Sequence, residues 1–187
     1  MTIQVKEKDI DEIKEKIAKT NTILSKINYV ESAIKESNFG LEIKRYLYQV
    51  LSELYEERKM FDRSAKAMSN KASMEITFRN KIESYLRAGE LYSKALKADD
   101  ADEMFSRASR EANDLEKQKI KLTKKNIYFA TARDLEKKMK RSAASKFYEK
   151  LITMNLEEIE KKEVKEKLVS IYKNLGMFRE IKLLEGI

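Results

Sequence analysis

Residues 82–108 read IESYLRAGELYSKALKADDADEMFSRA, and this stretch decides the fold. Small and aromatic residues recur along it at three- and four-residue intervals: Tyr85, Ala88, Gly89, Tyr92, Ala101, Phe105 and Ala108. Such spacing predicts two amphipathic helices. Small residues let two helices approach closely, and aromatic rings fill the space beside them. We therefore expect a helical hairpin here, with close packing as the reason to keep Gly89 inside a helix.

The same pattern recurs on both sides of this stretch. Four landmark pairs stand 37, 43 and 37 residues apart: Leu54-Tyr55, Leu91-Tyr92, Asp134-Leu135 and Ile171-Tyr172. Residues 128–151 repeat the pattern well, and residues 48–68 and 168–181 repeat it loosely. Short polar joints are expected at four places: Glu57-Arg58-Lys59, Lys97-Ala98-Asp99, Lys138-Met139-Lys140 and Asn174-Leu175-Gly176. The longer middle step predicts extended helices around Glu111–Lys125.

Residues 45–187 resemble the tetratricopeptide repeat, a helix–turn–helix unit with a period of about 34 residues. Residues 82–151 carry the best match, with Tyr85 in place of the usual Trp and Ala88 in place of the usual Leu. The chain departs from the family by its longer period and by having no Pro. A related TPR-like hairpin fold and a plain helical bundle remain alternatives. The resemblance implies a right-handed α-α superhelix with a concave groove.

Composition favours an all-α chain. There is no Pro and only four Gly, whereas β-rich domains need many turns that consume both. We expect one helical domain over residues 1–187, with about four TPR-like hairpins over residues 41–187. We expect residues 6–39 to form one long helix or a hairpin that ends at Ser37-Asn38-Phe39-Gly40. In the hairpin, Thr22 caps the second helix. The apolar stripe of residues 6–39 packs as a cap on the array or pairs as a coiled coil.

The residue types that most enzymes use are absent. The chain has no His and no Cys, which removes the usual nucleophile–base pairs and the common zinc ligands. No phosphate-cradling loop is present. The sequence therefore predicts a non-catalytic protein with no metal and no cofactor. No apolar run is long enough to span a membrane and no signal peptide begins the chain, so we expect a cytoplasmic protein.

The resemblance also implies which residues line the groove, because in this family fixed positions of each first helix do so. The candidates in this chain are Tyr46, Gln49, Glu53, Glu56, Glu83, Leu86, Glu90, Phe129 and Arg133. Further positions implied in the same way are Ser93, Asn126, Glu136, Glu163, Glu166, Ser170 and Lys173. At these positions the first two expected hairpins offer glutamates and no basic residue, which favours a basic or neutral peptide as the ligand. Gln49 and Glu53 replace the basic clamp by which some family members hold a chaperone's carboxylate.

The alternative function is nucleic-acid binding. Residues 117–150 hold twelve Lys or Arg against three Asp or Glu. This excess of nine positive charges is larger than the net charge of +8 for the whole chain. The patch comprises Lys117, Lys119, Lys121, Lys124, Lys125, Lys137, Lys138, Lys140 and Arg141. Phosphates would bind such a patch, but Tyr128 and Tyr148 occupy core repeat positions and are not expected to stack on bases. A protein or peptide is the preferred partner, and the terminal helices leave room for a homodimer.

Overall fold

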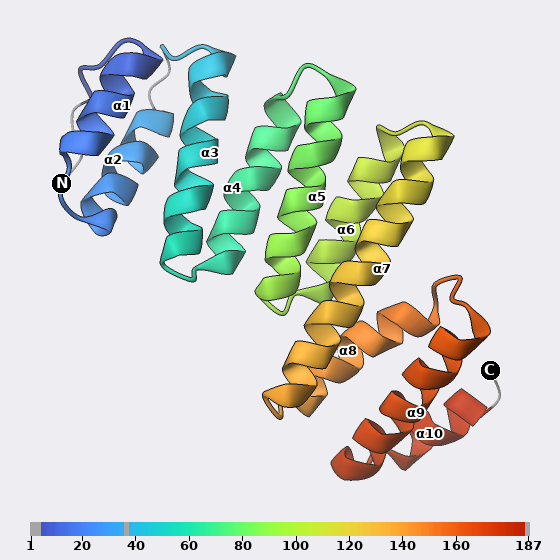
Figure 1. Cartoon of the computed structure of the whole chain (residues 1–187). Helices are drawn as coiled ribbons and strands as arrows, with labels where there is room; N and C mark the ends of the chain where they lie inside the picture. The colour runs from blue at the N-terminus through green and yellow to red at the C-terminus, as the bar shows by residue number, and fades with distance from the viewer. Residues whose placement is uncertain (1–4, 36–37, 186–187) are drawn as a thin grey trace. The chain divides into compact units, whose positions relative to one another are not determined.

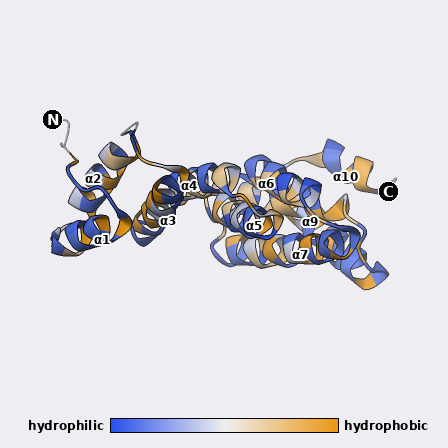
Figure 2. Ribbon diagram, turned by 90° about the horizontal axis from the view of Figure 1, so that it is seen from above, coloured by the Kyte–Doolittle hydropathy of each residue, from blue (hydrophilic) through white to orange (hydrophobic). Residues whose placement is uncertain are grey.

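A computed structural model describes residues 5–35 and 38–185. Every regular element among these residues is an α-helix, which confirms the all-α prediction (Figure 1). Figure 2 shows hydrophobic and hydrophilic residues mixed along the helices, as amphipathic helices require. None of the described helices is both long and apolar enough to cross a bilayer. The chain divides into two compact units, Met1–Asn113 and Asp114–Ile187, and the single domain over 1–187 stays a prediction.

Each unit is a succession of helices. The first contains α1 (Ile10–Lys19), α2 (Ile23–Lys35), α3 (Leu41–Glu57), α4 (Phe61–Met74), α5 (Phe78–Lys94) and α6 (Ala98–Arg110). The second contains α7 (Asp114–Lys137), α8 (Arg141–Ile152), α9 (Glu158–Leu175) and α10 (Phe178–Glu185). From α2 to α6, and again from α7 to α10, each helix packs on the next one in sequence. An array of helical hairpins has this contact pattern; the right-handed superhelix itself stays a prediction.

The N-terminal segment forms two helices rather than one. Asp9 begins α1 by accepting the backbone N–H groups of Asp11 and Glu12, each at 2.9 Å. Thr22 precedes α2 and accepts the N–H of Ser25 at 3.1 Å, so it caps that helix as expected. Ser37 of the expected stop lies outside the described residues, and α2 has already ended at Lys35.

Gly40 has a different role from the one expected. It was expected to stop the first segment, but it is the N-cap of α3, with φ at −64°. The apolar stripe packs in one buried cluster with Leu47 of α3, and Ile13 and Val30 are its fully buried members. This burial agrees with the cap on the first hairpin rather than with a coiled coil.

Four turns share one backbone conformation. Lys59, Leu96, Met139 and Gly176 each have a left-handed φ, between 56° and 72°. At each turn, the N–H of the next residue reaches back five positions to the carbonyl of Tyr55, Tyr92, Leu135 or Tyr172, at 2.8 to 2.9 Å. This is the Schellman motif that ends many helices. The turns stand 37, 43 and 37 residues apart, which is the spacing of the landmark pairs in the sequence.

The expected joint Lys138-Met139-Lys140 is confirmed, whereas the other three are displaced by one or two residues, since α3 includes Glu57 and α9 runs to Leu175. Helix α6 begins at Ala98, so the joint placed at Lys97-Ala98-Asp99 lies two residues too late. Asp99 is instead in the first turn of α6, where negative charge offsets the helix dipole. The longer middle step is explained by α7, which has 24 residues against 17 in each of α3 and α5.

Candidate functional site

A hollow of about 480 Å³ opens between α3, α4 and α5 in the first unit. Its lining comprises Gln49, Ser52, Glu53, Glu56, Met68, Lys71, Glu75, Asn80, Glu83, Ser84 and Arg87. All of these residues except Met68 are polar or charged. Small-molecule sites are mostly apolar with a few polar groups, so this hollow differs from them.

Polar side chains are buried beneath the hollow. Six buried polar or charged residues occur in the described part of the chain, and four of them lie here: Ser52, Ser64, Glu75 and Ser84. Buried polar groups are the informative exceptions in a folded chain, since burying them costs free energy unless they are hydrogen-bonded.

Ser52 and Ser64 join α3 to α4. The Ser52 hydroxyl donates to the Ser64 carbonyl at 3.0 Å, and the Ser64 hydroxyl donates to the Ser52 carbonyl at 2.8 Å. Small residues at this helix crossing were expected from the repeat. Gly89 and Ala101 hold the equivalent positions in the next hairpin, where no hydroxyl is present.

A buried ion pair lies beside the two serines. Lys71 of α4 is 3.0 Å from Glu75, and their side chains are only 20% and 7% exposed. The Lys71 ammonium also donates to the Ser84 hydroxyl of α5 at 3.0 Å. The bond to Ser84 therefore ties the end of α4 to α5.

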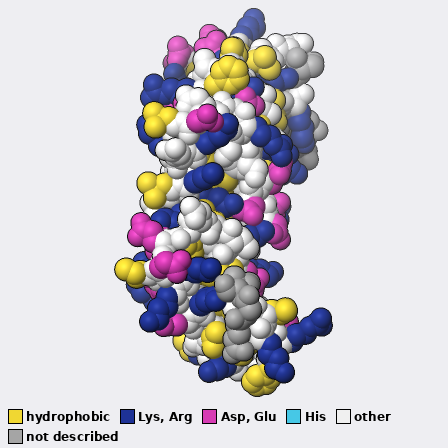
Figure 3. All heavy atoms as spheres, turned by 90° about the vertical axis from the view of Figure 1, so that its right-hand side faces the viewer, with side chains coloured by type: hydrophobic (Ala, Val, Ile, Leu, Met, Phe, Trp, Pro, Cys, Tyr) yellow, Lys and Arg dark blue, Asp and Glu magenta, His cyan; other side chains and the backbone are white. Residues whose placement is uncertain are grey.

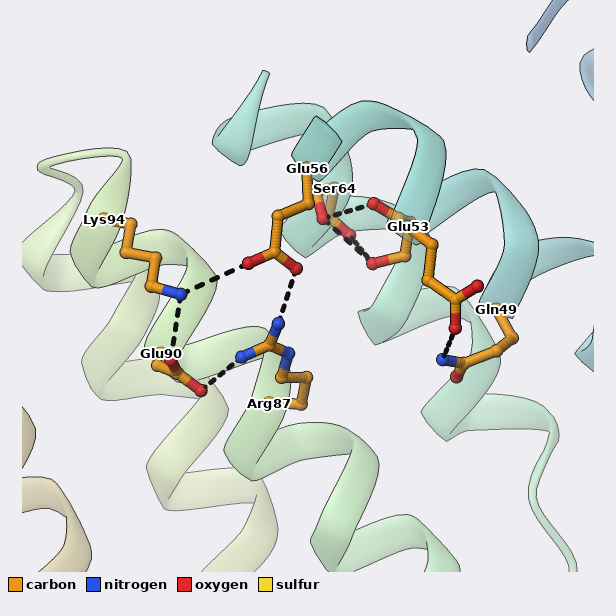
Figure 4. Close-up of polar contacts among 8 residues, drawn as sticks. Gln49, Glu53, Glu56, Ser64, Arg87, Glu90 and Lys94 are labelled. Atoms are coloured by element: carbon orange, nitrogen blue, oxygen red, sulfur yellow. Dashed lines mark hydrogen bonds and ion pairs between the residues drawn. The ribbon is translucent and has the colours of Figure 1, made fainter. Parts of the chain in front are cut away.

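Four charged residues form a network at the edge of the hollow (Figure 4). Arg87 donates to Glu56 of α3 at 2.5 Å and to Glu90 of its own helix at 2.6 Å. Lys94 contacts the same two carboxylates at 3.2 and 3.0 Å. Burial would raise the pKa of Glu90, but hydrogen bonds and charges from Lys94 and Arg87 outweigh it and lower this pKa below the usual value.

The expectation that this part of the groove holds no base is therefore wrong. Glu56 and Glu90 are neutralised by Arg87 and Lys94, and Lys71 adds a third cation. The resemblance did not point to these three cations, because it implies only the residues that face the groove directly. Long basic side chains reach it from neighbouring positions.

Two lining carboxylates remain exposed. Glu53 accepts a hydrogen bond from the Gln49 amide at 2.6 Å, one helical turn away (Figure 4). Glu83 pairs at 3.1 Å with Arg79, and both side chains are largely exposed, at 62% and 85%. Exposed pairs of this kind contribute little stability.

The structure brings four of the expected groove residues together: Gln49, Glu53, Glu56 and Glu83. Tyr46 and Leu86 are half-buried and do not line the hollow. Burial raises the pKa of Tyr46, and the Lys14 ammonium lies 5.8 Å from its ring. Ser93 is buried and donates to the Gly89 carbonyl, so its expected place in the groove is wrong.

Four of the groove residues expected in the second unit contact other residues of that unit. Phe129 is buried, so the expectation of an apolar side chain facing an open groove is wrong there. The Arg133 guanidinium lies 5.1 Å from the Phe129 ring and pairs with Glu163 at 2.9 Å. Glu136 accepts the Tyr148 hydroxyl at 2.7 Å. Four further positions are exposed: Asn126, Glu166, Ser170 and Lys173.

The basic patch is less uniform than its sequence. Helix α7 rises about 36 Å at 1.5 Å per residue, so Lys117–Lys125 and Lys137–Arg141 lie near opposite ends of it. Lys125 pairs with Glu160 at 2.7 Å and is largely buried. Figure 3 shows, on one face, Lys and Arg side chains scattered among acidic and hydrophobic ones.

Tyr128 and Tyr148 are buried, as expected from their core positions, and cannot stack on bases in this structure. Among the described residues, no group of three or more His, Cys, Asp or Glu is placed to hold a metal ion. Comparisons with protein-family models, curated proteins and solved structures find no match, so the fold and the hollow alone point to a function.

Proposed function

We propose that this chain is a non-catalytic interaction protein and that the hollow between α3, α4 and α5 binds a segment of a protein partner. The observation that carries the proposal is the group of buried polar side chains beneath an open hollow. Packing does not require the hydroxyl groups of Ser52 and Ser64, because Gly89 and Ala101 fill the equivalent positions in the next hairpin.

The chemistry of the lining suits a peptide. An extended or helical segment presents amide groups and polar side chains, and the Gln49 and Asn80 amides offer both donors and acceptors to them. The hollow is open and polar, whereas an apolar small molecule would gain little from burial there. TPR-like repeats, which the chain resembles, bind peptides on such surfaces.

Site-specific photocrosslinking tests the proposal in extract from the native cell. A benzophenone amino acid replaces Glu53 or Glu83 at the hollow, or Glu57 at the end of α3 as a matched exposed control. We expect a discrete protein adduct at both hollow positions and none at the control. An Asn80→Trp variant, which places an indole at the hollow, should lose the adduct while circular dichroism stays unchanged.

Equal adducts at all three positions, or an adduct that survives Asn80→Trp, would contradict the proposal. The same purification with and without nuclease tests the alternative of nucleic-acid binding through residues 117–150. A partner lost only after nuclease treatment would favour that alternative.

A further inference from the structure

We infer that the hollow selects a cationic segment, and that Glu53 and Glu83 receive its Lys or Arg side chains. This inference rests on the proposed function and specifies the chemistry of the partner. Some charged groups of the lining are already paired within the protein, whereas others can still bind a ligand. The inference follows from this difference.

The cations of the lining are engaged. Lys71 contacts Glu75 and Ser84, and Arg87 donates to both Glu56 and Glu90. A ligand carboxylate or phosphate would have to break these charge-assisted bonds, which are the stronger class of hydrogen bond. The hollow is therefore poorly suited to an anionic ligand.

The carboxylates of the lining keep unused capacity. Four carboxylates and two cations line the hollow, and Lys94 and Arg79 beside it also pair with Glu56 and Glu83. An ionised carboxylate offers about four lone-pair sites. Glu53 uses one for the Gln49 amide, and Glu83 contacts Arg79 through a largely exposed pair. Both side chains are exposed at the hollow, where the ammonium or guanidinium of a bound segment can reach them.

The charge of the whole chain makes this selectivity distinctive. The net charge of +8 attracts anions in general and repels cationic peptides at long range. Physiological salt limits that repulsion to within about 8 Å. Preference for a cationic peptide therefore has to come from local contacts, and it cannot be a non-specific effect of net charge.

Three octapeptides with one neutral fluorophore test the inference by fluorescence anisotropy at physiological salt. They alternate Ala with Lys, Glu or Gln. We expect the Lys peptide to bind most tightly, and the E53Q/E83Q variant to weaken it roughly two- to thirty-fold, the range for losing two exposed ion pairs. The matched control E42Q/E57Q makes the same charge change at two exposed positions of α3 that do not line the hollow, and it should leave the affinity unchanged.

Three results would overturn the inference: no binding of the Lys peptide at millimolar concentration, equal or tighter binding of the Glu peptide, or unchanged affinity in E53Q/E83Q. Circular dichroism checks that each variant stays folded. If photocrosslinking at the hollow succeeds while the Lys preference fails, the proposed function stands and the charge selectivity is wrong. If both fail, the proposed function is wrong as well.

Discussion

Gly89 lies where two helices come closest in the first unit. A Cβ atom added to it would stand 2.8 Å from two ring carbons of Phe105, which is itself 1% exposed. Helix propensity alone favours Ala over Gly by about 1 kcal/mol, but forcing extra volume into a packed core costs about 1–3 kcal/mol. We expect Gly89→Ala to lower the free energy of unfolding by about 1 kcal/mol in urea titrations.

Gly40→Ala is the matched control for this prediction. No atom lies within 4 Å of a Cβ added there, and the φ of −64° suits any residue. We expect only a small net change in its stability, because Ala is a poorer N-cap than Gly but lowers the conformational entropy of the unfolded chain by a similar free energy. A Gly89→Ala variant as stable as the parent would mean that the Phe105 ring moves aside at no cost.

Single residues also show where sequence-based prediction of the site succeeds and fails. Gln49 and Glu53 were expected at the groove because the resemblance to the tetratricopeptide repeat implies that fixed positions of each first helix line it. The pairing of Glu56 with Arg87 was not expected, because the two residues are 31 positions apart. Only the packing of α3 beside α5 brings their side chains together.

The turns are the clearest repeat at the scale of elements. Three of the four left-handed positions carry a residue other than Gly, and each such residue costs about 1–2 kcal/mol in that conformation. Met139 is the most suitable for a test because its side chain is 64% exposed and contributes little packing.

We expect Met139→Gly to raise the free energy of unfolding by about 0.5–1 kcal/mol, since relief of strain exceeds the added entropy of an unfolded Gly. Gly176→Ala makes the opposite change at the equivalent turn and should lower it by about 1 kcal/mol. Both turns belong to the second unit, so urea unfolding followed by circular dichroism compares them directly. A shift of the same sign in both variants would contradict the shared conformation.

Element boundaries were predicted where sequence signals are local. The joint at Met139 was placed correctly, and those near Lys59 and Gly176 to within two residues, because a helical period is interrupted at each of them. The start of α6 was misplaced by two residues, because Ala98 and Asp99 suit a joint and a first turn equally well. The division into two units was not expected, since contacts between helices rather than composition define it.

For the whole molecule, charge sets the response to acid. The chain has 40 Lys or Arg and 32 Asp or Glu, so protonating carboxylates leaves a large positive excess that opposes compactness. Each unit also contains a glutamate whose pKa is lowered. In the first unit Glu90 is one of three, with Glu7 and Glu103. In the second it is Glu160, lowered by a hydrogen bond from Lys125, which outweighs desolvation.

A lowered pKa means that the folded chain binds fewer protons than the unfolded chain. The stability that Glu90 and Glu160 supply is complete above their unfolded pKa of about 4.3, and is lost as the pH falls through their folded pKa. We therefore expect urea midpoints to fall between about pH 5 and pH 3, and to fall less steeply in Glu90→Gln and Glu160→Gln. Glu57→Gln, which changes an exposed residue at the end of α3, is the control and should follow the parent. If the Glu90→Gln and Glu160→Gln curves instead run parallel to the parent, neither ion-pair network contributes to acid sensitivity, and general charge repulsion accounts for it.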